Sequence, residues 1–153
     1  MFPIEKLYRS LIYHMSELAP SGVSVVEGES YGVRFEDPTG KNPSVTVTME
    51  NIAEQPIELG SFGTNYSVVY TITALSRLQR DALKSIVYSG LLYNPVQVYS
   101  AFQQYAPASG AIVERIAESQ PPIIIRDMPN FESDRERFFW VSIVSVGFDT
   151  IGL

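Results

Sequence analysis

The chain has 153 residues, of which 45% are hydrophobic and 12% are aromatic, and its formal net charge is −6. A chain of this size and composition is expected to fold as one domain with a hydrophobic core rather than to remain disordered. The acidic balance argues against binding of nucleic acid through a basic patch. The absence of cysteine excludes disulfides and thiolate metal sites.

The N-terminal segment predicts a helix of the folded domain and not a targeting signal. It lacks the basic end and long apolar core of a signal peptide, and no apolar run in the chain approaches the roughly 20 residues that span a membrane. Between residues 3 and 18 the apolar positions recur every three or four residues, which places them on one helical face. These positions are Ile4, Leu7, Tyr8, Leu11, Ile12, Met15 and Leu18. Pro20 and Gly22 then end the helix.

The middle of the chain predicts strands followed by a second helix. A short strand is compatible with residues 22–26, and the glycine-rich residues 27–42 predict a long loop or a loose hairpin. Apolar and polar residues alternate over 44–50 and again over 66–74, which is the pattern of half-buried strands.

Ser76 is the expected start of the second helix, over residues 76–92. Gln79 lies three residues further on, and this spacing is that of a capping box. The periodicity predicts a buried face made of Leu78, Ala82, Leu83, Ile86, Val87 and Gly90.

The C-terminal third predicts mainly strands. Residues 96–106 are compatible with either a strand or a short helix. Two short strands are expected at 112–116 and 123–126, separated by a Pro-Pro dipeptide. The strand expected at 137–148 is apolar on both faces, which is typical of a central, covered strand. The whole pattern predicts a single α+β domain over 1–153, with a mostly antiparallel sheet flanked by two or three helices.

No residue pattern predicts a catalytic, metal or cofactor site. His14 is the single histidine, and without cysteine or a second histidine a zinc site is not expected. The sequence has no G-x-S-x-G motif for a serine nucleophile. Its acidic pairs fall in predicted polar loops, where no apolar wall would raise the pKa of a catalytic acid. We therefore expect no enzymatic activity, no metal and no cofactor.

A stripe of positive charge lies on the second predicted helix. Arg77, Arg80 and Lys84 fall on one side of it, with Asp81 nearby. Such a stripe is usually a solvated face. The alternative is a set of charges that pairs with acids on a neighbouring subunit, because interface charges set register and partner choice.

The order of the elements resembles that of the tail terminator proteins of long-tailed bacteriophages, the lambda-like neck family. The resemblance is carried by Glu58-Leu59-Gly60, the strand at 66–74, the helix at 76–92 and the strand at 137–148. That helix begins Ser-Arg-Leu-Gln-Arg-Asp-Ala-Leu, and the last strand follows an arginine-rich turn. The pattern covers most of the chain, although residues 94–120 form a longer segment than the family has.

The resemblance implies a structural virion protein of the head-tail connector region. Its subunits would form a homohexameric ring at the head-proximal end of the phage tail, ending polymerisation of the tail tube and joining tail to head. The implied partners are further copies of the chain, the tail tube protein and a head-completion or connector protein. DNA would pass through the lumen without specific binding, and no membrane would be involved. The protein would assemble in the host cytoplasm and reside in the tail neck of the virion.

Within this hypothesis, the candidate subunit or tube interface consists of Leu59, Phe62, Arg77, Arg80 and Lys84. Glu27 and Glu29 are candidates for an acidic lumen, over which DNA would slide without sticking. Two other classes remain open. One is another neck, head-completion or baseplate protein. The other is a small cytoplasmic ligand-binding domain or enzyme, which would need an apolar pocket with convergent polar groups.

Overall fold

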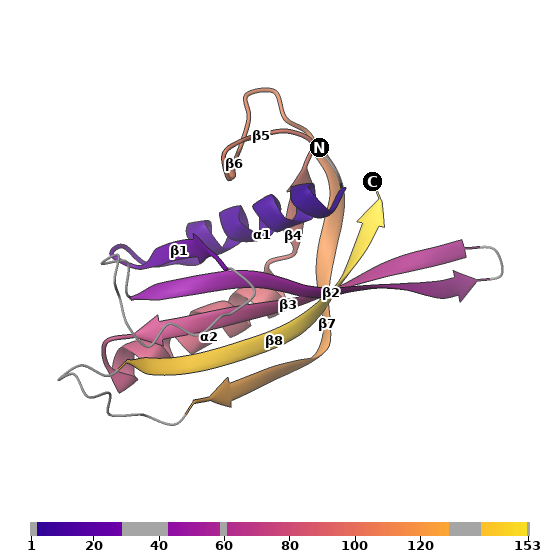
Figure 1. Cartoon of the computed structure of the whole chain (residues 1–153). Coiled ribbons are helices and arrows are strands. Elements are labelled where there is room, and N and C mark those ends of the chain that lie inside the picture. Colours follow the sequence, from indigo (N-terminus) through magenta and orange to yellow (C-terminus); the bar gives the residue numbers. More distant parts are fainter. Residues whose placement is uncertain (1–2, 29–42, 59–60, 129–138, 153) are drawn as a thin grey trace.

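The computed structural model describes residues 3–28, 43–58, 61–128 and 139–152 (Figure 1). At residues 3, 50–58, 61–65 and 151–152 it describes the backbone alone. The two helices are α1 (Pro3–Leu18) and α2 (Arg77–Tyr93). The strands are β1 (Ser24–Glu27), β2 (Ser44–Glu58), β3 (Ser61–Ala74), β4 (Val96–Tyr99), β5 (Phe102–Gln103), β6 (Ala106–Pro107), β7 (Val113–Asp127) and β8 (Trp140–Gly152).

Six of the strands form one sheet in the order β1-β2-β3-β8-β7-β4, and β5 pairs with β6 separately. Within the six-stranded sheet only β1 and β2 run parallel, and every other neighbouring pair is antiparallel. Both helices contribute to one apolar core against the sheet. The expected α+β fold with a mostly antiparallel sheet is therefore confirmed.

The core is built from the apolar face of each predicted strand. β3 and β8 pair over ten residues, from Asn65 opposite Asp149 to Ala74 opposite Trp140, and form the centre of the sheet. The buried strand residues of this core are Val45, Val47, Tyr66, Val68, Tyr70, Ile72, Ala74, Val96, Val98, Ala117, Val144, Val146 and Phe148. From α1 they meet Leu7, Leu11, Ile12 and Met15, four of the seven positions expected on the apolar face of that helix.

Two close contacts are among those that hold α1 in place. The Tyr8 hydroxyl donates a hydrogen bond to the Val47 carbonyl at 2.8 Å and accepts one from the Gly28 N–H at 3.2 Å. At the other end of the helix, Leu18 packs against Gly90 of α2, where an added Cβ would come within 2.3 Å of the Leu18 side chain. The missing side chain at Gly90 thus lets the two helices approach closely.

The capping box at the start of α2 is present, but the predicted buried face of this helix was partly wrong. The Gln79 N–H donates to the Ser76 hydroxyl at 3.1 Å, and the Gln79 side-chain oxygen accepts from the Leu75 N–H. Leu83, Val87 and Gly90 are buried as expected, together with Arg80 and Leu91. Leu78 and Ala82 instead face solvent. The apolar positions of this sequence lie on two sides of the helix, and only one side packs.

Strands β2 and β3 are longer than the alternation predicted. The alternation predicted strands only over 44–50 and 66–74, but the two strands remain paired from Met49 opposite Val68 to Glu58 opposite Ser61, with irregularities after Met49 and after Pro56. Among the described residues, β8 pairs with β3 only from Asn65 onward, and β1 pairs with β2 only up to Val47. Residues 51–58 and 61–64 therefore form the two strands of a hairpin, here called the arm, that projects beyond the rest of the sheet (Figure 1). Backbone pairing extends both strands here, although apolar and polar residues no longer alternate along them.

The C-terminal strands differ from the prediction in extent. The strands expected at 112–116 and 123–126 are one strand, β7, which continues through the cis peptide bond between Pro121 and Pro122 with an irregular register. The ambiguous residues 96–106 contain β4 and the β5–β6 hairpin, with no helix. The last strand, β8, runs to Gly152 and lies between β3 and β7, as expected for a central strand.

The buried hydroxyl of Tyr70 yields a stability prediction. The Tyr70 side chain is fully buried, and its oxygen has no hydrogen-bond partner among the described residues. Because an unpaired buried polar group is costly, Tyr70→Phe should raise the free energy of unfolding by about 0.5–1 kcal/mol. Urea denaturation measures this change, with Phe148→Ala as a core control that should lower it by about 3–5 kcal/mol. A clear loss of stability in Tyr70→Phe would contradict the prediction.

Candidate functional site

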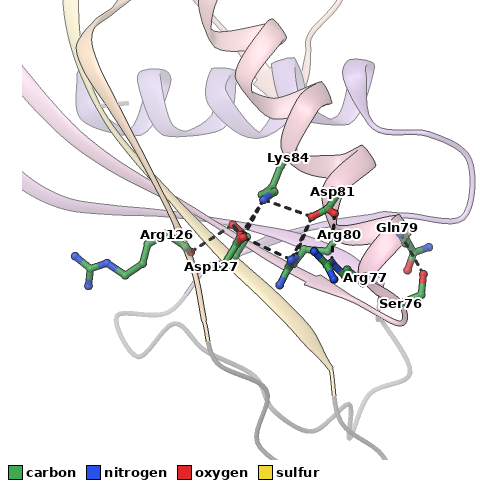
Figure 2. Close-up of polar contacts among 9 residues, drawn as sticks. Ser76, Arg77, Gln79, Arg80, Asp81, Lys84, Arg126 and Asp127 are labelled. Atoms are coloured by element: carbon green, nitrogen blue, oxygen red, sulfur yellow. Dashed lines mark hydrogen bonds and ion pairs between the residues drawn. The ribbon is translucent and has the colours of Figure 1, made fainter.

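The most concentrated set of charged contacts joins α2 to β7 (Figure 2). The Lys84 ammonium lies 3.0 Å from both carboxylate oxygens of Asp127. The same ammonium lies 3.4 Å from Oδ1 of Asp81, one helical turn earlier. Lys84 thus links an acid on its own helix to an acid at the end of β7.

Arg80 lies at the centre of this cluster and is 6% exposed. Its Nη2 atom lies 3.2 Å from Oδ1 of Asp81 and 3.5 Å from Oδ2 of Asp127. Its guanidinium carbon lies 5.3 Å from the centre of the Trp140 ring. A cation over an indole face is attracted by the ring quadrupole, most strongly where water is excluded. The Trp140 ring and the carboxylates of Asp81 and Asp127 together compensate the burial of this charge.

The strand pairing explains why Asp127 reaches α2. Asp127 lies opposite Ser142 of β8, and the Ser142 hydroxyl donates to its Oδ1 at 2.9 Å. Ser142 is fully buried on the helix-facing side, in the same alternation as Val144 and Val146. The β7–β8 register therefore directs the Asp127 carboxylate toward Arg80 and Lys84.

Both acids of the cluster are stabilised in their ionised form. Desolvation raises the pKa of Asp127, but hydrogen bonds from Lys84 and Ser142 and the charges of Arg80 and Lys84 outweigh it, so the pKa falls below its ordinary value. The pKa of Asp81 is lowered in the same way, with desolvation outweighed by hydrogen bonds from Arg80 and Lys84. Two carboxylates thus offset most of the positive charge that the sequence places on α2.

The charged stripe is accordingly arranged differently from a plain solvated face. Arg77 is exposed, with its Nε 3.9 Å from Asp81 Oδ2, whereas Arg80 is buried and Lys84 is partly covered. The acids that these residues meet belong to the same chain. Their proposed role at a subunit interface stays a prediction.

The structure describes some of the other candidate residues and not others. Leu59 and Glu29 lie outside the described residues. Phe62 lies in the arm opposite Pro56, with its side chain outside the described part of the structure. Glu27, at the end of β1, accepts a hydrogen bond from the Tyr105 hydroxyl, which raises the pKa of Tyr105. Glu27 thus ties β1 to the segment after β5, and its assignment to a lumen stays a prediction.

His14 occupies a structural position between the two helices. Its Nε2 lies 2.8 Å from the carbonyl oxygen of Asn94, the residue that caps α2, and therefore donates to it. Its Nδ1 is buried and has no partner within the described residues. Burial lowers the pKa of His14, partly offset by the hydrogen bond to Asn94. The neutral ring serves as a bridge from α1 to the end of α2.

Sequence reasoning missed the apolar surface that α2 and β7 leave exposed. On α2 and beside it, Leu75, Leu78, Tyr88, Leu92 and Tyr93 are exposed. On β7, Ile124 and Ile125 are 53% and 40% exposed. The run Pro121-Pro122 before three isoleucines was the available signal, because proline within a strand is typical of a sheet edge.

The described residues contain no group of three or more histidines, aspartates or glutamates placed to hold a metal ion. No helix in this part of the chain is long and apolar enough to cross a membrane. Comparison of the chain with protein-family models and with curated proteins found no match. The candidate site is therefore interpreted from its own geometry.

The charge cluster predicts a pH-dependent contribution to stability. Because the pKa of Asp127 is lowered by folding, its stabilisation is complete above its unfolded pKa of about 4 and is lost as the pH falls through the folded pKa. Asp127→Asn should therefore lower the free energy of unfolding at pH 7 by about 0.5–1 kcal/mol, since this half-exposed pair is screened by solvent. The difference from wild type should shrink as the pH falls below about 4.

Urea denaturation at several pH values measures this effect. Asp149→Asn is a matched control, because Asp149 forms no ion pair within the described residues. A constant difference between Asp127→Asn and wild type from pH 7 to pH 3 would contradict the electrostatic assignment.

Proposed function

We propose that this chain is a structural subunit of a ring, a homohexamer, at the head-proximal end of a long phage tail. In this role it ends polymerisation of the tail tube and joins the tail to the head. It has no catalytic activity and carries no cofactor. Its partners are further copies of itself, the tail tube protein and a head-completion or connector protein.

The arm is the observation that carries the proposal. Residues 51–58 and 61–64 pair with each other and with no third strand among the described residues. A two-stranded hairpin is only marginally stable in water and needs a packing surface or further strands. A monomer gains little from such an extension, whereas an assembly gains a contact that reaches into a neighbouring subunit or the tube.

The exposed apolar surface of α2 and β7 supports the same conclusion. Large apolar residues that remain exposed on the body of a small domain can mark a surface that meets a partner. The chain thus combines a projecting element with an apolar surface on its body. Both features favour assembly over a small-molecule function.

The charge distribution supports the passage of DNA without binding. The net charge is −6, and the cations Arg80 and Lys84 meet Asp81 and Asp127 within the chain. The cluster therefore offers no free basic patch for the phosphate backbone. An acidic channel repels DNA and lets it move.

The decisive experiment is tail assembly with and without this protein. We expect electron microscopy of the purified protein mixed with tail tubes to show a ring at one tube end, and we expect the capped tails to join heads. Tails assembled without the protein should vary in length and fail to join heads. Normal virions made without the protein would contradict the ring assignment.

Leu59 and Phe62 are the candidate contacts to the tube or a neighbour, and a double substitution tests them. Leu59→Asp/Phe62→Asp should abolish capping if these residues dock, because two carboxylates would be desolvated at the contact. Ile112→Asp, a change of the same kind at an exposed isoleucine outside the arm, is the matched control. Normal-length, head-competent tails from the double variant would contradict the docking role of these two residues.

A further inference from the structure

The sheet has a long unpaired edge along β7. β4 covers β7 only from Val113 to Ala117, so that residues 118–127 have no strand beside them on this side within the described part of the chain. The prolines at 121 and 122 have no N–H to offer, but residues 123–127 can pair with another strand. An exposed strand edge is a template for pairing with another chain.

The helix α2 provides an apolar surface beside this edge. Lys84 contacts Asp127, and the Leu91 carbonyl accepts a hydrogen bond from Ser119 at 2.6 Å, so α2 runs alongside β7. Tyr88 lies between them at helical spacing and is 40% exposed. Ile125 lies opposite the core residue Val144 and therefore points to the same side of the sheet. Tyr88 and Ile125 thus border the open edge with exposed apolar area.

The chain contains a second open edge of matching kind. β1 covers β2 only from Ser44 to Val47, so that the outer side of β2 from Thr48 to Glu58 has no neighbouring strand among the described residues. This outer side belongs to the arm, which lacks a third strand. Because the two open edges lie on different sides of the molecule, they can pair with each other only between two copies.

One exposed cation beside the β7 edge complements the acidic charge of the arm. Residues 42–76 carry Glu50, Glu54 and Glu58 and no lysine or arginine, so the arm is acidic. Beside the β7 edge, the Arg126 side chain is exposed and points away from the Asp127 cluster (Figure 2). Arg126 has no ion pair among the described residues. An acidic strand is therefore favoured at this edge over a basic one.

We infer that the β7 edge, over residues 123–127, binds the outer edge of the β2 arm of a second copy of this chain. The sheet then continues from one subunit to the next. Because the two edges differ, the contact is head-to-tail and closes into a ring or extends as a filament. The inference deepens the ring proposal and rests on it only in requiring that copies of the chain associate.

Cross-linking tests the contact directly, because the natural chain contains no cysteine. Gln55→Cys places a thiol in the arm, and Ile124→Cys places one at the β7 edge. A short thiol-to-thiol cross-linker should join a mixture of these two variants into dimers and join neither variant to itself. The double variant should give a ladder of higher multimers.

Ile112 offers a matched control, since it is an isoleucine 66% exposed outside β7. The mixture of Gln55→Cys with Ile124→Cys should give about tenfold more dimer than the mixture of Gln55→Cys with Ile112→Cys, because bound edges raise the effective concentration. Equal yields would overturn the inference. Dimers formed by Ile124→Cys alone would also overturn it, since they would mean that two β7 edges pair symmetrically.

A charge substitution gives an independent measurement. Ile124→Glu should weaken self-association in sedimentation equilibrium by about tenfold, because a carboxylate would be desolvated beside the acidic arm, whereas Ile112→Glu should leave it unchanged. Circular dichroism checks that both variants fold. Equal association of the two variants would overturn the inference.

The two proposals fail in different ways. If rings form on tube ends but Gln55→Cys and Ile124→Cys are not preferentially cross-linked, this contact is overturned and the ring function is not. Preferential cross-linking in a protein that never caps a tail would support the contact and overturn the neck function.

Discussion

The burial of Arg80 fixes how α2 sits on the sheet. A guanidinium cannot be buried without compensating partners, and this one finds them only where Asp81, Asp127 and the Trp140 ring meet. The helix orientation that satisfies it also places Leu83 and Val87 in the core. The same orientation directs Leu78 to solvent and brings Tyr88 beside β7. With Arg80 on the buried side of α2, Leu78 and Leu92 remain on its exposed side.

The buried face of α2 was predicted partly wrongly from the sequence, and the reason is physical. Periodicity weighs each residue by its hydrophobicity, so an arginine is assigned to the outside and a leucine to the inside. The long apolar stem of arginine packs well once its head is paired. The pairing residue Asp127 lies 47 positions after Arg80 and reaches it only through the β7–β8 register. No local pattern contains that information.

Other parts of the fold were predictable because their cause is local. Spacing within a few residues is enough to predict four features: the helix at 3–18, the strands near 44–50 and 66–74, and the Ser76–Gln79 cap. The arm was missed because backbone pairing, not side-chain alternation, extends β2 and β3. The open edges of β2 and β7 depend on where short neighbouring strands end. That is a property of the assembled sheet, and it decides which surfaces remain for a partner.

The ion pair between Lys6 and Glu114 has a consequence for how the protein is made. The two residues are 108 positions apart, and their side chains meet at 2.9 Å. α1 also contacts β4, which leaves the ribosome late, so most of its partners do not yet exist when it emerges. During synthesis its apolar face is open to water or to a chaperone, and the chain is vulnerable to aggregation until nearly all of it is available.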